Sequence, residues 1–71
     1  MNITTNGEAV SIDPLTVQQY LVSLGIDPRR VAVELNQDIL PKAQYEDTQL
    51  QDGDSLEIVH FVGGGAGAPR P

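Results

Sequence analysis

Apolar and polar side chains alternate over residues 1–12, with one interruption at Asn6-Gly7. Both interrupting residues tolerate the positive φ that a type I′ turn requires. The pattern therefore predicts a two-stranded antiparallel hairpin with one apolar face. The side chains expected on that face are Met1, Ile3, Thr5, Val10 and Ile12.

The next apolar side chains recur with the spacing of an α-helix. They stand at i, i+3, i+4 and i+7, which predicts a short helix with one buried stripe. Thr16 precedes the stripe and can cap the helix, and Gly25 follows it where a left-handed residue is favoured. Ile26 is expected to fold back onto the core, and Asp27-Pro28 cannot continue the helix. The stripe consists of Val17, Tyr20, Leu21 and Leu24.

Three further extended segments follow the helix. Residues 31–35 alternate as a strand, and Ile39-Leu40-Pro41 forms a short run that its proline confines to a sheet edge. The third segment, Ser55 to Val62, is the most apolar and is expected at the centre of the sheet, beside the first strand. In it, Leu56 and Ile58 are expected to face the helix.

The segment between the last two strands is polar. It is expected to hold an irregular turn or a short 3₁₀ helix, with Tyr45 and Leu50 as isolated apolar anchors. Asp52-Gly53-Asp54 predicts a tight turn into the last strand.

The order of elements is strand, strand, helix, strand, short strand, strand. This order predicts an α+β domain, with a mixed sheet of four to five strands and one helix packed across one face. That is the β-grasp, or ubiquitin-like, arrangement. We expect the domain to span residues 1–62, followed by a flexible glycine-rich arm and tail over residues 63–71.

The strongest candidate for function is the end of the chain. Gly63-Gly64-Gly65 follows the predicted central strand directly and carries no Cβ atoms. Glycine loses the most backbone freedom on ordering, so the segment predicts an arm that projects from an anchored strand. We interpret it as an arm presented to another protein, the alternative being a linker without a function of its own.

The net charge and the composition limit the classes of partner that the chain is expected to bind. Ten acidic residues stand against four Lys and Arg, for a net charge of −6, which disfavours nucleic acids and anionic membranes. The charge favours a partner with a basic surface, or serves solubility alone. The sequence opens with no leader pattern and has no apolar run of about 20 residues, so we expect a cytoplasmic protein. It has no cysteine, which fits any compartment.

Four segments in register resemble the sulfur carrier family of thiamin thiazole biosynthesis, a ubiquitin-like group to which the small subunit of molybdopterin synthase is related. The resemblance covers residues 1–65. The segments are the Met1–Gly7 hairpin start, residues 31–42, the Asp52-Gly53-Asp54 turn, and the ending from Glu57 to Gly65.

The resemblance implies a carrier and not an enzyme. It places the chemistry on Gly65, with Gly64 and Gly63 before it, and implies that a separate E1-like enzyme uses ATP to adenylate that glycine. A sulfur donor such as a cysteine desulfurase then leaves a thiocarboxylate, which thiazole synthase or a similar enzyme accepts. The carrier itself binds no cofactor. The acceptor pathway is left open by the sequence.

The chain departs from the family pattern after Gly65. Six further residues, 66–71, follow Gly65, and they have the composition of a disordered tail. While they are attached, the Gly65 carbonyl is part of an amide and cannot be adenylated. We therefore expect cleavage after Gly65, with cleavage after Gly64 as the alternative, by a metalloprotease of the kind known for related carriers, unless the six residues are an expression remnant.

The remaining candidates lie on the last strand. Val59 and Phe61 are expected on the open face of the sheet as a docking patch, although Phe61 could instead fold onto Tyr45 or the sheet edge. His60 is the only histidine and is expected to be a half-buried strand residue, not a metal ligand. Two other functions stay open: a β-grasp interaction module, and a protein modifier that forms isopeptide bonds.

Overall fold

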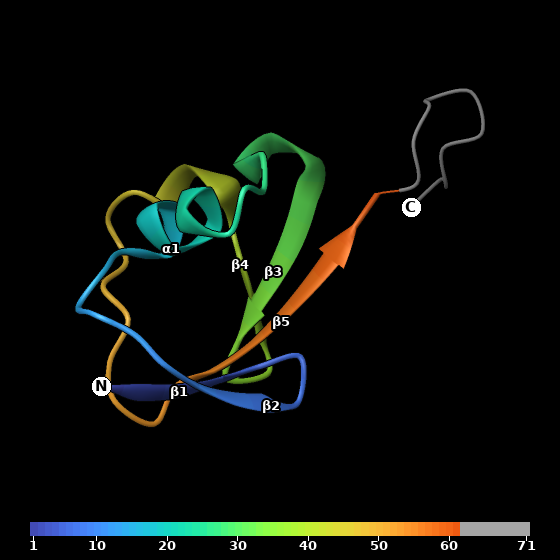
Figure 1. Cartoon of the computed structure of the whole chain (residues 1–71). Coiled ribbons are helices and arrows are strands. Elements are labelled where there is room, and N and C mark those ends of the chain that lie inside the picture. Colours follow the sequence, from blue (N-terminus) through green and yellow to red (C-terminus); the bar gives the residue numbers. More distant parts are fainter. Residues whose placement is uncertain (62–71) are drawn as a thin grey trace.

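Within residues 1–61, five strands form one mixed sheet in the order β2-β1-β5-β3-β4, and one α-helix lies across one face of it (Figure 1). The computed structural model describes residues 1–61; Val62 and the predicted arm and tail at 63–71 lie outside them. The elements are β1 (Asn2–Thr5), β2 (Glu8–Ser11), α1 (Val17–Ser23), η1 (Pro28–Arg30), β3 (Val31–Leu35), β4 (Asp38–Leu40), η2 (Lys42–Gln44) and β5 (Ser55–His60), where η marks a 3₁₀ helix.

The hairpin prediction is confirmed. β1 and β2 pair antiparallel, and both turn residues have positive φ, 49° at Asn6 and 86° at Gly7. These are the signs that a type I′ turn needs, and its twist matches the twist of the strands. Ile3 is buried, and Val10 and Ile12 pack against the core from the same side.

The ends of α1 are set by local hydrogen bonds. Thr16 and Gln19 form a capping box, in which each side chain accepts a hydrogen bond from the other residue's backbone N–H. At the other end, Gly25 N–H donates to Val22 O (2.9 Å) and Ile26 N–H donates to Leu21 O (3.0 Å). This pair of bonds is a Schellman motif, and Gly25 supplies its positive φ of 78°.

The prediction that Leu24 belongs to the buried stripe is wrong. The helix ends at Ser23, and Leu24 is its C-cap with 48 % of its surface exposed. The Schellman turn redirects the chain at Gly25, directly after Leu24, and Ile26 packs against the core from this end of the helix. The expected fold-back of Ile26 is thus confirmed.

β5 occupies the centre of the sheet, as predicted. It runs antiparallel to β3 through five residue pairs, from Leu35 opposite Leu56 to Val31 opposite His60. On its other side it runs parallel to β1, with Thr4 and Thr5 opposite Ser55 and Leu56. β5 therefore pairs with a neighbouring strand along each of its edges. This central place in the sheet is typical of the most apolar strand.

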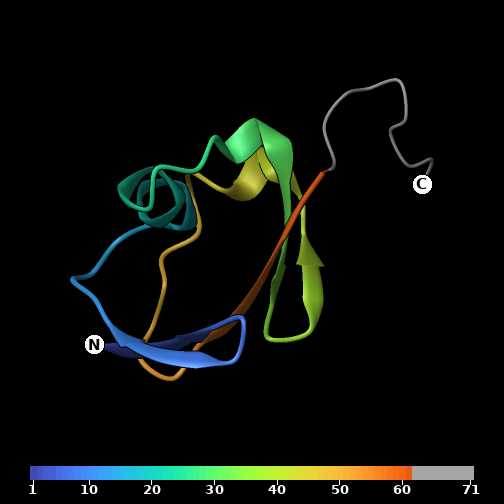
Figure 2. The ribbon, with the colours of Figure 1, turned by 45° about the vertical axis from the view of Figure 1, so that its right-hand side comes forward.

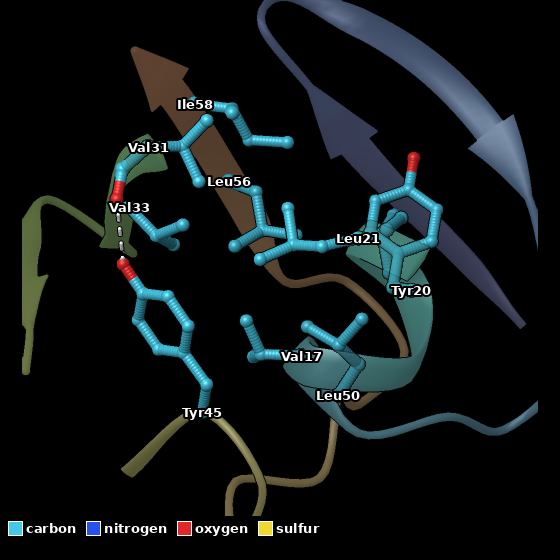
Figure 3. Close-up of a cluster of buried hydrophobic side chains, with 10 residues drawn as sticks. Val17, Tyr20, Leu21, Val31, Val33, Tyr45, Leu50, Leu56 and Ile58 are labelled. Carbon is cyan, nitrogen blue, oxygen red and sulfur yellow. Dashed lines mark hydrogen bonds between the residues drawn. The ribbon is translucent and has the colours of Figure 1, made fainter. Parts of the chain in front are cut away.

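The core lies between the sheet and α1, and ten side chains are buried in it. Tyr45 enters from the loop after η2, and its hydroxyl donates to Val31 O on β3 (3.3 Å; Figure 3). Burial raises the pKa of Tyr45. Tyr45 and Leu50 are both anchors, as predicted. The buried set is Ile3, Val17, Tyr20, Leu21, Val31, Val33, Tyr45, Leu50, Leu56 and Ile58.

The chain connections place both 3₁₀ helices at one end of the sheet. In Figure 2, η1 (green) and η2 (yellow) lie at the same end as the C-terminal end of β5, and the β1–β2 hairpin lies at the opposite end. β4 is an edge strand, as its proline predicted. Gly53 turns the chain into β5 with a φ of 91°.

Candidate functional site

The last described residues of β5 are fixed to β3 up to the point where the strand ends. His60 lies opposite Val31, and Phe61 N–H donates to Arg30 O (3.1 Å), one position beyond the strand. Leu56 and Ile58 face the core, as predicted, and are 0 % and 8 % exposed. The exit of the chain from the sheet therefore has a defined position.

The other edge of β5 is closed by one side chain. β1 ends at Thr5, and the backbone N–H of Asn6 donates to Leu56 O (2.8 Å). The Asn6 amide reaches further along β5: its Oδ1 accepts from Ile58 N–H (2.7 Å) and its Nδ2 donates to Ile58 O (3.3 Å). This side chain takes the place of a strand residue and satisfies both backbone groups of Ile58. It clamps the exit of β5 to the N-terminal turn.

The clamp is tested by Asn6→Asp, which replaces the amide nitrogen with a carboxylate oxygen that cannot donate to Ile58 O. We expect a loss of about 1–3 kcal/mol in the free energy of unfolding, because a partly buried acceptor loses its donor. Urea unfolding measures it. Gln44→Glu makes the same change on an exposed side chain and should alter stability by less than about 0.5 kcal/mol. Equal midpoints for the two variants would contradict the clamp.

The open face of the sheet carries the predicted docking residues. Val59 is 58 % exposed, Phe61 is 50 % exposed, and Ile39 on β4 is 77 % exposed. Tyr45 points into the core, and the Phe61 ring is instead covered by Lys42, whose Nζ lies 4.7 Å from the ring centroid. This distance is in the range of a cation–π contact. Both docking candidates are thus accessible to a partner.

The expectation for His60 is wrong in one respect. Its side chain is exposed, although Val31, directly opposite it on β3, is buried. Residues 1–61 contain no group of three or more His, Cys, Asp or Glu that could hold a metal ion.

The loop before β3 contains an ion-pair cluster. Arg29 meets both oxygens of Asp27, with Nη2 at 2.9 Å from Oδ2 and Nε at 3.1 Å from Oδ1. These bonds from Arg29 lower the pKa of Asp27 to about 2. Arg30 Nε is more distant, at 3.6 Å from Asp27 Oδ2.

A family model described as the ThiS family matches residues 2–65 of the chain. The chain belongs to the ThiS family. The match covers the whole described domain and continues through Gly63, Gly64 and Gly65, which lie outside the described residues.

Curated relatives of this ThiS-family chain include short and long proteins. The sulfur carrier protein ThiS of Bacillus subtilis is 45 % identical over 53 residues, covering 75 % of this chain and 80 % of its own length. The thiazole synthase of Paramagnetospirillum magneticum is 46 % identical over 67 residues, covering 93 % of this chain and 21 % of its own length. The chain thus spans about a fifth of the length of the thiazole synthases that it matches.

The fold of this ThiS-family chain matches a solved structure. The crystal structure of the thiamine biosynthesis protein ThiS of Geobacter metallireducens aligns with a TM-score of 0.79 and 36 % identity, and the match covers 92 % of this chain and all of that one. The predicted β-grasp fold is confirmed. Within residues 1–61, no helix is long and apolar enough to cross a membrane.

Sequence reasoning missed one residue at the site of this ThiS-family chain. Asn6 was assigned only to the hairpin turn, because the Asn-Gly pair alone explains it. The contact between Asn6 and Ile58 joins residues 52 positions apart, and a local pattern contains no signal for it.

Proposed function

We propose that this chain is a sulfur carrier for the thiazole of thiamin or for a related cofactor. The observation that carries the proposal is the extent of the family match, which runs through residue 65 and so includes the three glycines. The similarity to the sulfur carrier protein ThiS of B. subtilis supports it. In this role the chain is a substrate and carrier, and separate enzymes catalyse each step.

The proposed reaction takes place at the carboxyl group of Gly65. A carboxylate is a poor acyl donor until one of its oxygens becomes a leaving group. On an E1-like activating enzyme, the carboxylate attacks the α-phosphate of ATP, pyrophosphate leaves, and an acyl adenylate forms. The terminal sulfur of a persulfide on a donor such as a cysteine desulfurase then attacks the carbonyl carbon, and AMP leaves. A thiol of a partner protein attacks the inner sulfur of the resulting acyl disulfide, so that Gly65 ends in a thiocarboxylate and the two partner sulfurs form a disulfide.

The described domain contributes a fixed starting point for the glycine arm. β5 is bonded to β3 through Phe61 and to Asn6 through Ile58, so the exit point does not move with the arm. The four residues 62–65 can reach about 13 Å from there, of which the three glycines contribute about 10 Å, at roughly 3.3 Å for each residue. The absence of Cβ atoms lets a narrow channel on the partner enclose such an arm.

Thiazole synthase is the acceptor that we propose for the sulfur. The thiazole synthase of P. magneticum contains a segment that is similar to nearly all of this chain. A carrier segment and its acceptor that occur in one protein are expected to act on the same intermediate. The proposal therefore places the Gly65 thiocarboxylate in the active site of a thiazole synthase or a similar enzyme.

The carboxyl group of Gly65 must be released before it can react. In the 71-residue sequence it forms a peptide bond with Ala66. We propose that residues 66–71 are removed by cleavage after Gly65, with a metalloprotease as the processing enzyme. Intact-mass analysis after incubation with a host extract tests this step, and a chain that stays at full length would contradict it.

The exposed face around Val59 and Phe61 is the surface that we propose for docking to the activating enzyme. Val59 and Phe61 are exposed apolar side chains next to the exit of the arm, where a docked partner also reaches Gly65. Apolar anchors of this kind dominate the binding energy of many interfaces.

The docking surface is tested by Val59→Asp and Phe61→Asp. Each should weaken binding to the activating enzyme by at least about tenfold, because a carboxylate would be buried against an apolar partner surface. Val22→Asp is the matched control, since Val22 is also 58 % exposed but lies on α1. Calorimetric titration measures binding and thermal melting measures stability. Equal losses of binding in Val22→Asp and Val59→Asp would contradict the assignment.

The sulfur-carrying role is tested by the mass of the protein isolated from cells that synthesise thiamin. A sulfur carrier ends at Gly65 and gains the mass difference between sulfur and oxygen. A protein modifier instead gives a large adduct on a partner, and an interaction module gives neither product. Either of the last two results would overturn the proposed function.

A further inference from the structure

The Lys and Arg residues of the described part of this acidic chain lie on its two 3₁₀ helices. The chain has four Lys and Arg against ten Asp and Glu, and the Lys and Arg within residues 1–61 are Arg29, Arg30 and Lys42. Arg29 and Arg30 belong to η1, and Lys42 begins η2. Both 3₁₀ helices lie at the end of the sheet where β5 ends (Figure 2).

Two of these three residues contact the last described residue, Arg30 through its backbone carbonyl and Lys42 through its ammonium group. Arg30 O accepts the hydrogen bond from Phe61 N–H (3.1 Å), and Lys42 Nζ lies 4.7 Å from the centroid of the Phe61 ring. We call Arg30 and Lys42 the basic pair. They stand on two different segments, η1 and η2, and both contact Phe61 where β5 ends.

The charges of the basic pair are available to a partner. Arg29 donates hydrogen bonds to both carboxylate oxygens of Asp27. Arg30 Nε lies 3.6 Å from Oδ2 of the same carboxylate, and the Arg30 side chain is 75 % exposed. Lys42 is exposed and has the Phe61 ring as its neighbour. Within residues 1–61, Arg29 and Arg30 thus share the single carboxylate of Asp27, and Lys42 forms no ion pair, so the charges of the basic pair are not fully neutralised.

We propose that the basic pair docks against carboxylates of the activating enzyme, at the mouth of the channel that receives the glycine arm. The inference rests on the proposed function. A positive patch on a protein of net charge −6 orients it during encounter, because the rest of its surface is repelled by an acidic rim. The patch then brings the exit of β5, and not another face, to the channel.

The phosphates of ATP are the competing occupant. The α-phosphate of ATP reacts with the Gly65 carboxyl. A fully extended chain of four residues, 62–65, would reach about 13 Å beyond Phe61. The basic pair lies at the start of this path, where the surface of the partner and not its nucleotide is expected. If the basic pair binds carboxylates of the enzyme, removing its charges raises the KM for the carrier. If it binds the phosphates of ATP, removing its charges raises the KM for ATP.

The test uses a chain that ends at Gly65 and carries Arg30→Gln and Lys42→Gln. At about 0.02 M salt we expect the KM for the carrier to rise about tenfold, and at about 0.5 M salt we expect the difference to disappear. The kcat of pyrophosphate release and the KM for ATP should not change. Arg30→Gln alone leaves the Lys42–Phe61 contact in place and should give part of the same effect.

The matched control carries Gln37→Glu and Gln51→Glu, two exposed positions at the opposite ends of β3 and β5. It has the same net charge as the test variant, and its KM for the carrier should stay within about twofold of the parent. An unchanged KM in the test variant, an equal rise in the control, or a rise in the KM for ATP would each overturn the inference. A parent chain that is not adenylated would instead overturn the proposed function.

Discussion

A chain that ends at Gly65 and carries Gly64→Val should bind the activating enzyme normally but form the acyl adenylate at least about 100 times more slowly. A branched side chain widens the arm next to the reacting carboxyl and narrows its backbone freedom. A displacement of about 1 Å at the reacting atoms is enough for a loss of this size. Pyrophosphate release under single-turnover conditions measures the rate.

The matched control for Gly64→Val is Ala9→Val. It also places a valine at a small residue, on the exposed face of the edge strand β2 and far from the exit of β5. Its rate should equal that of the parent. If Gly64→Val is adenylated as fast as Ala9→Val, the bare backbone at residue 64 has no role in the reaction.

Leu56→Ala should lower the free energy of unfolding by about 2–5 kcal/mol, the cost of an unfilled cavity in a core. Leu56 is fully buried on the central strand, at 0 % exposure. A domain of this size rarely has more than about 3–5 kcal/mol from its core, so most of the variant should be unfolded at body temperature. Thermal and urea unfolding followed by circular dichroism measure the loss.

The control for Leu56→Ala lies on the same strand. Val59 is 58 % exposed on the opposite face, and Val59→Ala should change stability by less than about 0.5 kcal/mol. A loss in Val59→Ala as large as in Leu56→Ala would mean that the side of the sheet toward α1 is not the core.

Most of the fold could be predicted because its signals are local. Asn6-Gly7 specifies a hairpin turn by its backbone preferences, and Thr16 specifies a helix start by its side chain. Leu24 was misplaced because the helical period alone does not show where the Schellman turn ends the helix. His60 was misplaced because the alternation along β5 does not show that burial on this face ends at Ile58.

The candidate site was predictable in part. The glycines follow from the sequence motif, and the exposure of Val59 and Phe61 follows from the alternation along β5. The clamp by Asn6 and the approach of Lys42 to Phe61 depend on contacts between distant segments. Such contacts arise only once the sheet is assembled, so no local pattern contains them.

Adenylation of the free Gly65 carboxyl is tested most directly by comparing two chains, one that ends at Gly65 and the other the 71-residue chain. Each is incubated with ATP and the activating enzyme. Both share the same folded domain, and they differ in whether the Gly65 carboxyl is free. We expect an acyl adenylate and released pyrophosphate from the shorter chain alone, because only its Gly65 carboxyl is free. A shorter chain that forms no acyl adenylate, or a 71-residue chain that forms it equally well without cleavage, would contradict the account.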